Sequence, residues 1–346
     1  DTTAFNFTMM YGLEAVTVPE FVKESLSLWE SSSVKIDIDD KAIMWIVDGA
    51  DDLSVTFAAR LMEQDVQVRI VDKDITLSGK NLSRGSPVVI AMDNPKNSRL
   101  VQLIKNTAKN LNVSVSSLYT GFGLEELPDW GGRHFRLLNK PQIAILSHEG
   151  FSSYDVGVSW WSLDHHLGIR HSQLNTSMLG YADLRRYNTL IMPSGYRSLD
   201  QAEMSFLKEW VKQGGTLIAN NGSTRMLISD NSITNIKDVS DSFENSHDYN
   251  IKLQREFLSK NISIDLDYVN SNKISTDISY PWEETENRID SDTLKKRDKW
   301  QSLFMPSGAF VAGRIDDKHW LTFGTIDTLP LLYSDFPVLM AGPGSK

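Results

Sequence analysis

The sequence contains no cysteine in 346 residues, which excludes disulfide bonds, thiolate zinc sites and cysteine nucleophiles and leaves the redox compartment undetermined. No apolar run approaches the ~20 residues of a membrane-spanning helix, so we expect no membrane span. The N-terminus also lacks the charged and apolar regions of a signal peptide. Basic residues are outnumbered, with 35 Lys and Arg against 45 Asp and Glu. The net charge of −10 argues against a nucleic-acid partner, because binding to a phosphate backbone requires a basic face.

The length leaves room for two domains of ordinary size, each with its own core. Residues 1–40 mix apolar and polar residues without a sustained period and predict a connecting segment from an upstream domain. Their abrupt opening predicts that the chain is a fragment of a longer protein. Residues 41–130 alternate apolar strands with amphipathic helices and predict a small αβ domain. Residues 140–346 predict a second α/β domain, interrupted by a polar insertion at about residues 229–300.

A parallel βαβαβ unit is predicted in the second domain, over residues 140–223. Each apolar run there ends in a small or polar cluster and is followed by a segment of helical period. The helix after the first strand has Ser153 or Asp155 as its expected cap and Gly168 just after its C-cap. A capping box that begins at Ser198 is expected to start the next helix.

Elsewhere, local signals predict where further elements begin. Ser54 or Asp52 is the expected cap of the first helix in the small domain, and Pro95 is expected to open the second helix. Two apolar segments, residues 304–317 and 319–333, predict strands around a polar turn. These strands are expected to complete the second sheet or to form a hairpin at its edge.

The predicted functional edge is the one where the parallel strands of the second domain end. In open α/β sheets, ligands and catalytic groups gather at the carboxyl ends of the strands. Three turns follow these strand ends, at residues 147–150, 193–195 and 220–223. From them we select Glu149, Ser194 and Asn221 as candidate ligand-binding residues. Glu149 has an alternative role, as a cap for the helix that follows it.

Ser223 is the candidate nucleophile of this edge. A serine in such a turn needs a base within hydrogen-bond reach and donors for an oxyanion. His148, His247 and His319 are possible bases, with His319 and Glu149 retained as catalytic candidates beside the serine. The favoured alternative is a structural turn, because the sequence is N-G-S-T-R and carries no G-x-S-x-G elbow.

No metal or cofactor site is predicted in this chain. His165 and His166 are adjacent on a predicted helix, where neighbouring side chains project about 100° apart and do not converge on one ion. Asp48, Asp51 and Asp52 follow a strand, but their spacing is not that of a calcium loop. Acidic residues in such a turn are common as helix caps.

The second domain resembles class I glutamine amidotransferase-like domains, which have a flavodoxin-like parallel sheet, in the arrangement and length of its strands. The resemblance implies a nucleophile at the turn of residues 221–223, where this chain has no cysteine. The whole chain also resembles the non-catalytic region that follows the catalytic domain in large bacterial zinc carboxypeptidase-like proteins of the carboxypeptidase A family. Residues 1–15, DTTAFNFTMMYGLEA, match the end of that catalytic domain, with Phe5 where a tryptophan is usual. Further matching motifs are GSPVV, WWSLDHHLG and HWLTFG, at residues 85–89, 160–168 and 319–324.

The resemblance implies a non-catalytic accessory region of a secreted or periplasmic protein, which supports or docks the catalytic domain or binds a ligand. No histidine of this chain has a glutamate three residues later, so zinc is expected only in the upstream domain. The implied partners are the upstream peptidase domain of the same polypeptide and, for a homo-oligomer, a second copy. Two alternatives remain: a serine-dependent amidotransferase-like hydrolase that uses Ser223, and a small-molecule binding or sensor domain.

Overall fold

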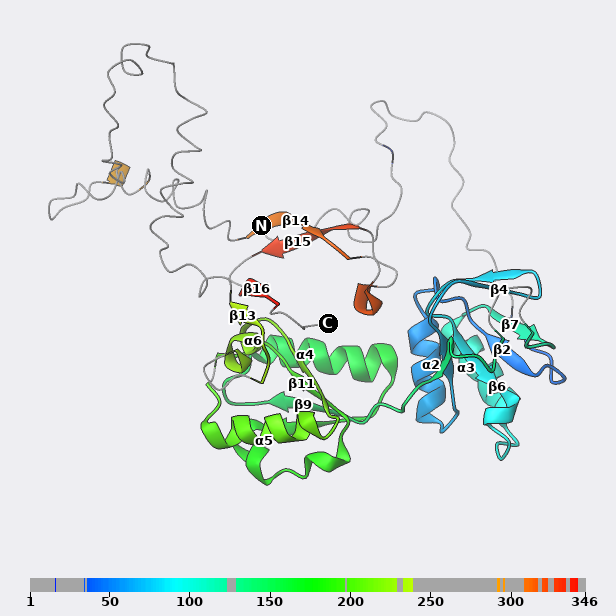
Figure 1. Ribbon diagram of the computed structural model, residues 1–346, viewed down its shortest axis with the longest axis horizontal. Coiled ribbons are helices and arrows are strands. Elements are labelled where there is room, and N and C mark those ends of the chain that lie inside the picture. The colour runs from blue at the N-terminus through cyan, green and yellow to red at the C-terminus, as the bar shows by residue number, and fades with distance from the viewer. Residues whose placement is uncertain are drawn as a thin grey trace, which may run out of the picture. The chain divides into compact units, whose positions relative to one another are not determined.

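The computed structural model describes two larger sheets flanked by helices (Figure 1). It describes residues 36–122, 129–196, 198–228, 233–238, 308–316, 319–322, 327–333 and 337–341, with isolated positions 16, 34, 291, 292 and 295. Most of the predicted connecting segment and of the polar insertion lies outside the described residues. Both larger sheets belong to the same unit of the chain. The mixture of helices and strands confirms the general α/β class.

The first sheet has six strands in the order β1-β7-β2-β6-β3-β8. Its β1 and β7 run parallel, and the other neighbouring pairs are antiparallel. It begins and ends a few residues outside the expected span of 41–130. The strands are β1 (Ile36–Asp37), β2 (Met44–Ile46), β3 (Arg69–Val71), β6 (Pro87–Ile90), β7 (Val115–Leu118) and β8 (Phe135–Leu137).

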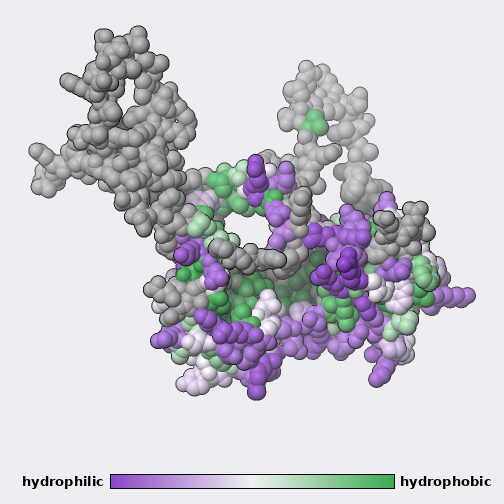
Figure 2. Space-filling view, in the orientation of Figure 1, coloured by the Kyte–Doolittle hydropathy of each residue, from purple (hydrophilic) through white to green (hydrophobic). Residues whose placement is uncertain are grey.

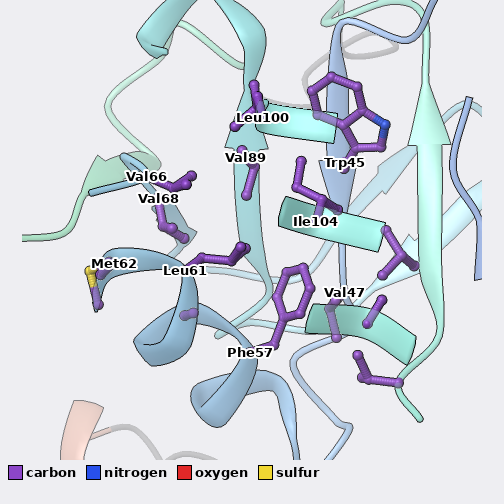
Figure 3. Packing of buried hydrophobic residues seen from close by; sticks show 14 of the residues in the cluster. Trp45, Val47, Phe57, Leu61, Met62, Val66, Val68, Val89, Leu100 and Ile104 are labelled. Carbon is purple, nitrogen blue, oxygen red and sulfur yellow. The ribbon is translucent and has the colours of Figure 1, made fainter. Parts of the chain in front are cut away.

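Both faces of this sheet are covered, which explains why its central strands are apolar at every position. Trp45 and Val89 point to helices α2 (Ser54–Glu63) and α3 (Leu100–Leu111), where they pack with Phe57 (Figure 3). Their neighbours in the strands alternate to the opposite face. There Met44, Ile46, Val88 and Ile90 pack under a hairpin of β4 (Ile75–Leu77) and β5 (Lys80–Leu82).

The predicted starts of the first two helices were wrong. Helix α2 has Leu53 at its N-cap position, without a side-chain cap. The nearby carboxylate of Asp51 instead accepts a hydrogen bond from the Leu53 N–H at 2.8 Å. Helix α3 begins at Leu100, five residues after Pro95, because residues 94–99 form turns. Short 3₁₀ helices are η1 (Ala91–Asp93), η3 (Thr176–Tyr181), η4 (Leu184–Arg186) and η6 (Trp320–Thr322).

The second sheet confirms the predicted parallel unit. Its four strands are all parallel, in the order β10-β9-β11-β12. Helices α4 and α5 lie on opposite faces of β9 and β11 (Figure 1). The strands are β9 (Ile143–Ser147), β10 (His171–Asn175), β11 (Thr189–Met192) and β12 (Thr216–Ala219). The helices are α4 (Ser153–Trp161), which continues as the π-helical η2 (Ser162–Leu167), α5 (Gln201–Lys212) and α6 (Gly222–Leu227).

The caps of this domain differ by one or two residues from the prediction. Ser152, rather than Ser153 or Asp155, caps α4 and accepts from the Asp155 N–H. The capping box of α5 is formed by Asp200 and Glu203 instead of starting at Ser198, and each of the two carboxylates accepts from the backbone N–H of the other residue. Gly168 ends the helical run in the left-handed conformation, with φ of 69°.

Helix α2 also contacts the second sheet with the face opposite to Phe57. Ala59 packs with Ile143, Leu163 and Ile169. At the rim of this contact, Arg170 pairs with Glu63 at 2.7 Å and Lys140 with Asp65 at 2.9 Å. The two sheets therefore share one apolar contact with a charged rim.

The C-terminal segments form small sheets of their own. Strands β14 (Ala309–Arg314) and β15 (Thr328–Tyr333) pair with each other in a separate two-stranded sheet. They therefore do not extend the four-stranded second sheet in the described residues, and the pairing within a hairpin is the part of the prediction that is observed. Strand β13 (Lys237–Asp238) pairs antiparallel with β16 (Leu339–Met340). Among the helices described here, none has the length and apolar character to cross a bilayer.

Candidate functional site

The three turns selected from the sequence meet at the carboxyl end of the second sheet; we call residues 147–152, 193–196 and 220–223 the crest. The Ser152 N–H donates to the Ser194 carbonyl at 2.8 Å, and the Tyr196 N–H to the Gly150 carbonyl at 2.9 Å. Strands β10 and β11 lie on opposite sides of β9, so the strand order reverses between β9 and β11. Open α/β sheets bind their ligands at such a reversal, so the crest is the place to look for chemistry.

Two glycines let the crest turns pack backbone against backbone. A Cβ atom on Gly195 would lie 2.6 Å from the Gly150 carbonyl oxygen and 2.9 Å from the ring of Phe151. A Cβ atom on Gly222 would lie 2.4 Å from the Gly195 carbonyl oxygen. Separations under 3 Å are sterically forbidden, so these turns leave no room for a side chain between them. The reversal point is filled by the protein itself.

Ser223 is fully buried beneath this packing. Its hydroxyl donates to the carbonyl oxygen of Pro193, and its N–H donates to the Asn220 carbonyl at 3.1 Å. Asn221 adopts the left-handed conformation that makes the turn, with φ of 49°. In the part of the chain described here, the hydroxyl proton of Ser223 is therefore directed to a backbone carbonyl and not to a histidine.

Neither of the described candidate bases, His148 and His319, forms the hydrogen bond of the Ser223 hydroxyl, which goes to Pro193. His148 is exposed at the end of β9, in the left-handed conformation with φ of 71°. The Nδ1 atom of His319 accepts from the Leu321 N–H at 3.2 Å, a contact within its own short helical turn. His247 lies outside the described residues.

The three ligand-binding candidates do share the crest. Glu149 is exposed, and Ser194 and Asn221 are half-buried. Glu149 is not the cap of α4, because Ser152 takes that position. The structure thus brings the three residues to one edge, where Glu149 faces solvent.

Within the residues that the structure describes, three cavities stand out, and no crest residue lines any of these three. One of about 200 Å³ lies between η4 and α5 beside Trp210, and one of about 590 Å³ surrounds Asn94. The third, of about 490 Å³, is lined by Asp48 and Asp74 next to the β4–β5 hairpin.

Asp48 illustrates the role of the acidic turn after β2. Burial raises the pKa of its carboxyl group, but hydrogen bonds from the N–H groups of Ala50 and Ser83 lower the pKa by more, so that it lies below the ordinary 3.8. The carboxylate is held by the backbone as a turn cap. No group of three His, Asp or Glu side chains within the described ranges is placed to hold a metal ion.

The sequence reasoning missed one surface feature, the outer face of α4. No residue of this helix is buried, and Tyr154, Val158 and Trp161 are all exposed. The ring of His165 stacks on Trp161 with centroids 3.9 Å apart and planes 9° from parallel. Figure 2 shows the exposed surface coloured by hydropathy, in the orientation of Figure 1. The signal was in the sequence, since these residues are four, three and four positions apart.

Comparison of the chain with protein-family models, with curated proteins and with solved structures finds no match. The family resemblance therefore stays a prediction.

Proposed function

We propose that this chain is a non-catalytic accessory region of a zinc carboxypeptidase-related protein, with an amidotransferase-like docking domain built on the second sheet. The observation that carries the non-catalytic part is the closed crest, in which Ser223 is buried and bonded to Pro193. The strand order, second-first-third-fourth along the chain, supports the flavodoxin-like part of the proposal.

Catalysis at Ser223 would need features that the crest does not offer. A nucleophilic serine must be reachable by its substrate and must pass its proton to a base. The hydroxyl of Ser223 donates its hydrogen bond to a carbonyl oxygen, which is no base, and the side chain is fully buried. The sensor alternative requires an open pocket with convergent polar groups, and none of the three cavities above reaches the crest.

Replacing Ser223 with alanine should lower the free energy of unfolding by about 1–3 kcal/mol, because it leaves the buried Pro193 carbonyl without its donor. It should change no hydrolytic activity. Urea unfolding measures the first effect, and intact-mass analysis after treatment with a serine-reactive fluorophosphonate tests the second. The matched control is Ser205→Ala on α5, whose exposed hydroxyl also donates to a backbone carbonyl, that of Gln201.

Covalent labelling of Ser223 by the probe would overturn the non-catalytic part. So would an esterase activity of the wild-type protein that the Ser223→Ala variant lacks. An equal stability loss in Ser223→Ala and Ser205→Ala would show that the crest is open to water.

The second part of the proposal, that this chain is an accessory region, depends on which domain the same polypeptide carries upstream. It places a zinc carboxypeptidase-like domain ahead of Asp1, in a bacterial protein that is secreted or periplasmic. The reading frame that encodes this chain tests it directly. A frame that codes for an H-x-x-E zinc motif upstream of Asp1 supports the proposal, and a frame that codes for any other kind of domain there refutes it.

A further inference from the structure

The cavity of about 200 Å³ beside Trp210 lies between α5 and η4, and we call it the α5 pocket. Residues 182–185 line one wall, and Phe206, Glu209, Trp210 and Gln213 of α5 line the other. Helix η4 leads directly into the start of β11, and α5 ends shortly before β12 begins. The pocket therefore lies near the amino ends of the parallel strands, at the edge opposite to the crest.

The apolar wall of the α5 pocket is fixed in place before any ligand arrives. The Nε1 atom of Trp210 donates to the Leu184 carbonyl at 3.0 Å. The indole also packs on Gly215, where a Cβ atom would lie 2.4 Å from the ring. Phe206 precedes Trp210 by one turn on the same face of α5. Preformed aromatic walls of this kind are typical of small-molecule sites, so the interior of the pocket favours an apolar group.

The polar lining of the α5 pocket carries charges of both signs. The Nε and Nη2 atoms of Arg185 donate to the carboxylate of Asp183 at 2.7 and 3.0 Å. Its Nη1 atom has no partner in the part of the chain that the structure describes. The carboxylate of Glu209 accepts from the Gln213 amide at 3.1 Å, and it forms no ion pair with the described residues. One cationic donor and one carboxylate are thus left for a ligand.

We propose that the α5 pocket binds a free α-amino acid with an aromatic side chain. The ring of the ligand packs against Phe206 and Trp210, its carboxylate accepts from Arg185 Nη1, and its ammonium group donates to Glu209. A cavity of about 150 Å³ already holds a benzene ring, so the volume suits a single ring. A ligand with only one charge would leave one of the two polar groups without a partner. This inference goes beyond the proposed function and does not depend on the crest, so the two can fail separately.

Isothermal titration of the whole chain with L-phenylalanine tests the proposal. We expect a dissociation constant on the order of 0.1–1 mM, because the ligand is small. Phenylalaninamide lacks the carboxylate, and N-acetylphenylalanine lacks the ammonium group. Each should bind about three- to fivefold more weakly than L-phenylalanine, since each loses one solvent-exposed ion pair. L-alanine, which has no ring to fill the pocket, should give no binding in this range.

Two variants assign the charges to the ligand groups. Arg185→Gln should weaken L-phenylalanine about three- to fivefold and leave phenylalaninamide unchanged, because the amide has no carboxylate to lose. Glu209→Gln should likewise weaken L-phenylalanine and leave N-acetylphenylalanine unchanged. The control is Arg186→Gln, since this exposed neighbour does not line the pocket.

Several results would overturn the proposal. One is the absence of binding when L-phenylalanine is raised to millimolar concentrations. Another is binding that Arg185→Gln and Glu209→Gln leave as strong as in the wild type. The same holds if L-alanine, or a phenylalanine derivative that lacks one charge, binds as tightly as L-phenylalanine.

Discussion

Replacing Gly222 with alanine should lower the free energy of unfolding by about 2–3 kcal/mol. The added methyl group would lie 2.4 Å from the Gly195 carbonyl oxygen, which is a backbone atom and cannot rotate away. That turn is tied to the neighbouring one by the Tyr196–Gly150 and Ser152–Ser194 hydrogen bonds, so it can move only if both turns move. Urea unfolding followed by far-UV circular dichroism measures the loss.

The control for this change is Gly180→Ala in η3, where nothing lies within 4 Å of the new methyl group. A substitution there should leave stability within about 0.5 kcal/mol of the wild type. If Gly222→Ala were equally harmless, the crest turns would not be in contact. The non-catalytic interpretation of the crest would then lose its steric basis.

Replacing Phe57 with alanine should cost about 3–5 kcal/mol, the largest loss that we expect from a single change. The ring is fully buried between α2 and the first sheet, where it packs among Trp45, Val89 and Ile104 (Figure 3). Removing it loses the transfer free energy of the ring and leaves a cavity that the sheet cannot collapse to fill. Because α2 also contacts the second sheet through Ala59, both sheets should lose stability.

A matched control lies two residues away on the same helix. Val55 is 61% exposed, and Val55→Ala should change the unfolding free energy by less than about 0.5 kcal/mol. Denaturant unfolding of both variants, followed by tryptophan fluorescence, gives the comparison. A small effect of Phe57→Ala would mean that α2 does not cover the first sheet as described.

The closed crest and the exposed apolar residues of α4 are two unusual features of the second sheet. The edge where this type of sheet ordinarily binds ligands is occupied by its own backbone. A helix that would ordinarily hide its apolar residues presents them to solvent. The closed edge is the observation behind the non-catalytic part of the proposed function.

Periodicity in the sequence alone determined the elements of the second sheet. The alternation of short apolar runs with helical segments predicted a parallel unit because a parallel strand pair needs a crossover helix between its strands. Gly168 was recognisable as a helix end because few other residues adopt positive φ without cost. The three crest turns were also placed correctly, since all strands of a parallel sheet end at the same edge.

Only the tertiary structure decided what those turns do. The burial of Ser223 depends on Pro193, thirty residues earlier, and the filling of the crest depends on the contact of Gly222 with Gly195. The order of the six strands in the first sheet likewise depends on long-range pairing, such as that of β3 with β8. Contacts of this kind leave no local period, because they join residues that are distant in the chain. For the same reason the sequence did not show that Tyr154, Val158 and Trp161 on α4 are exposed, because exposure depends on what else packs nearby.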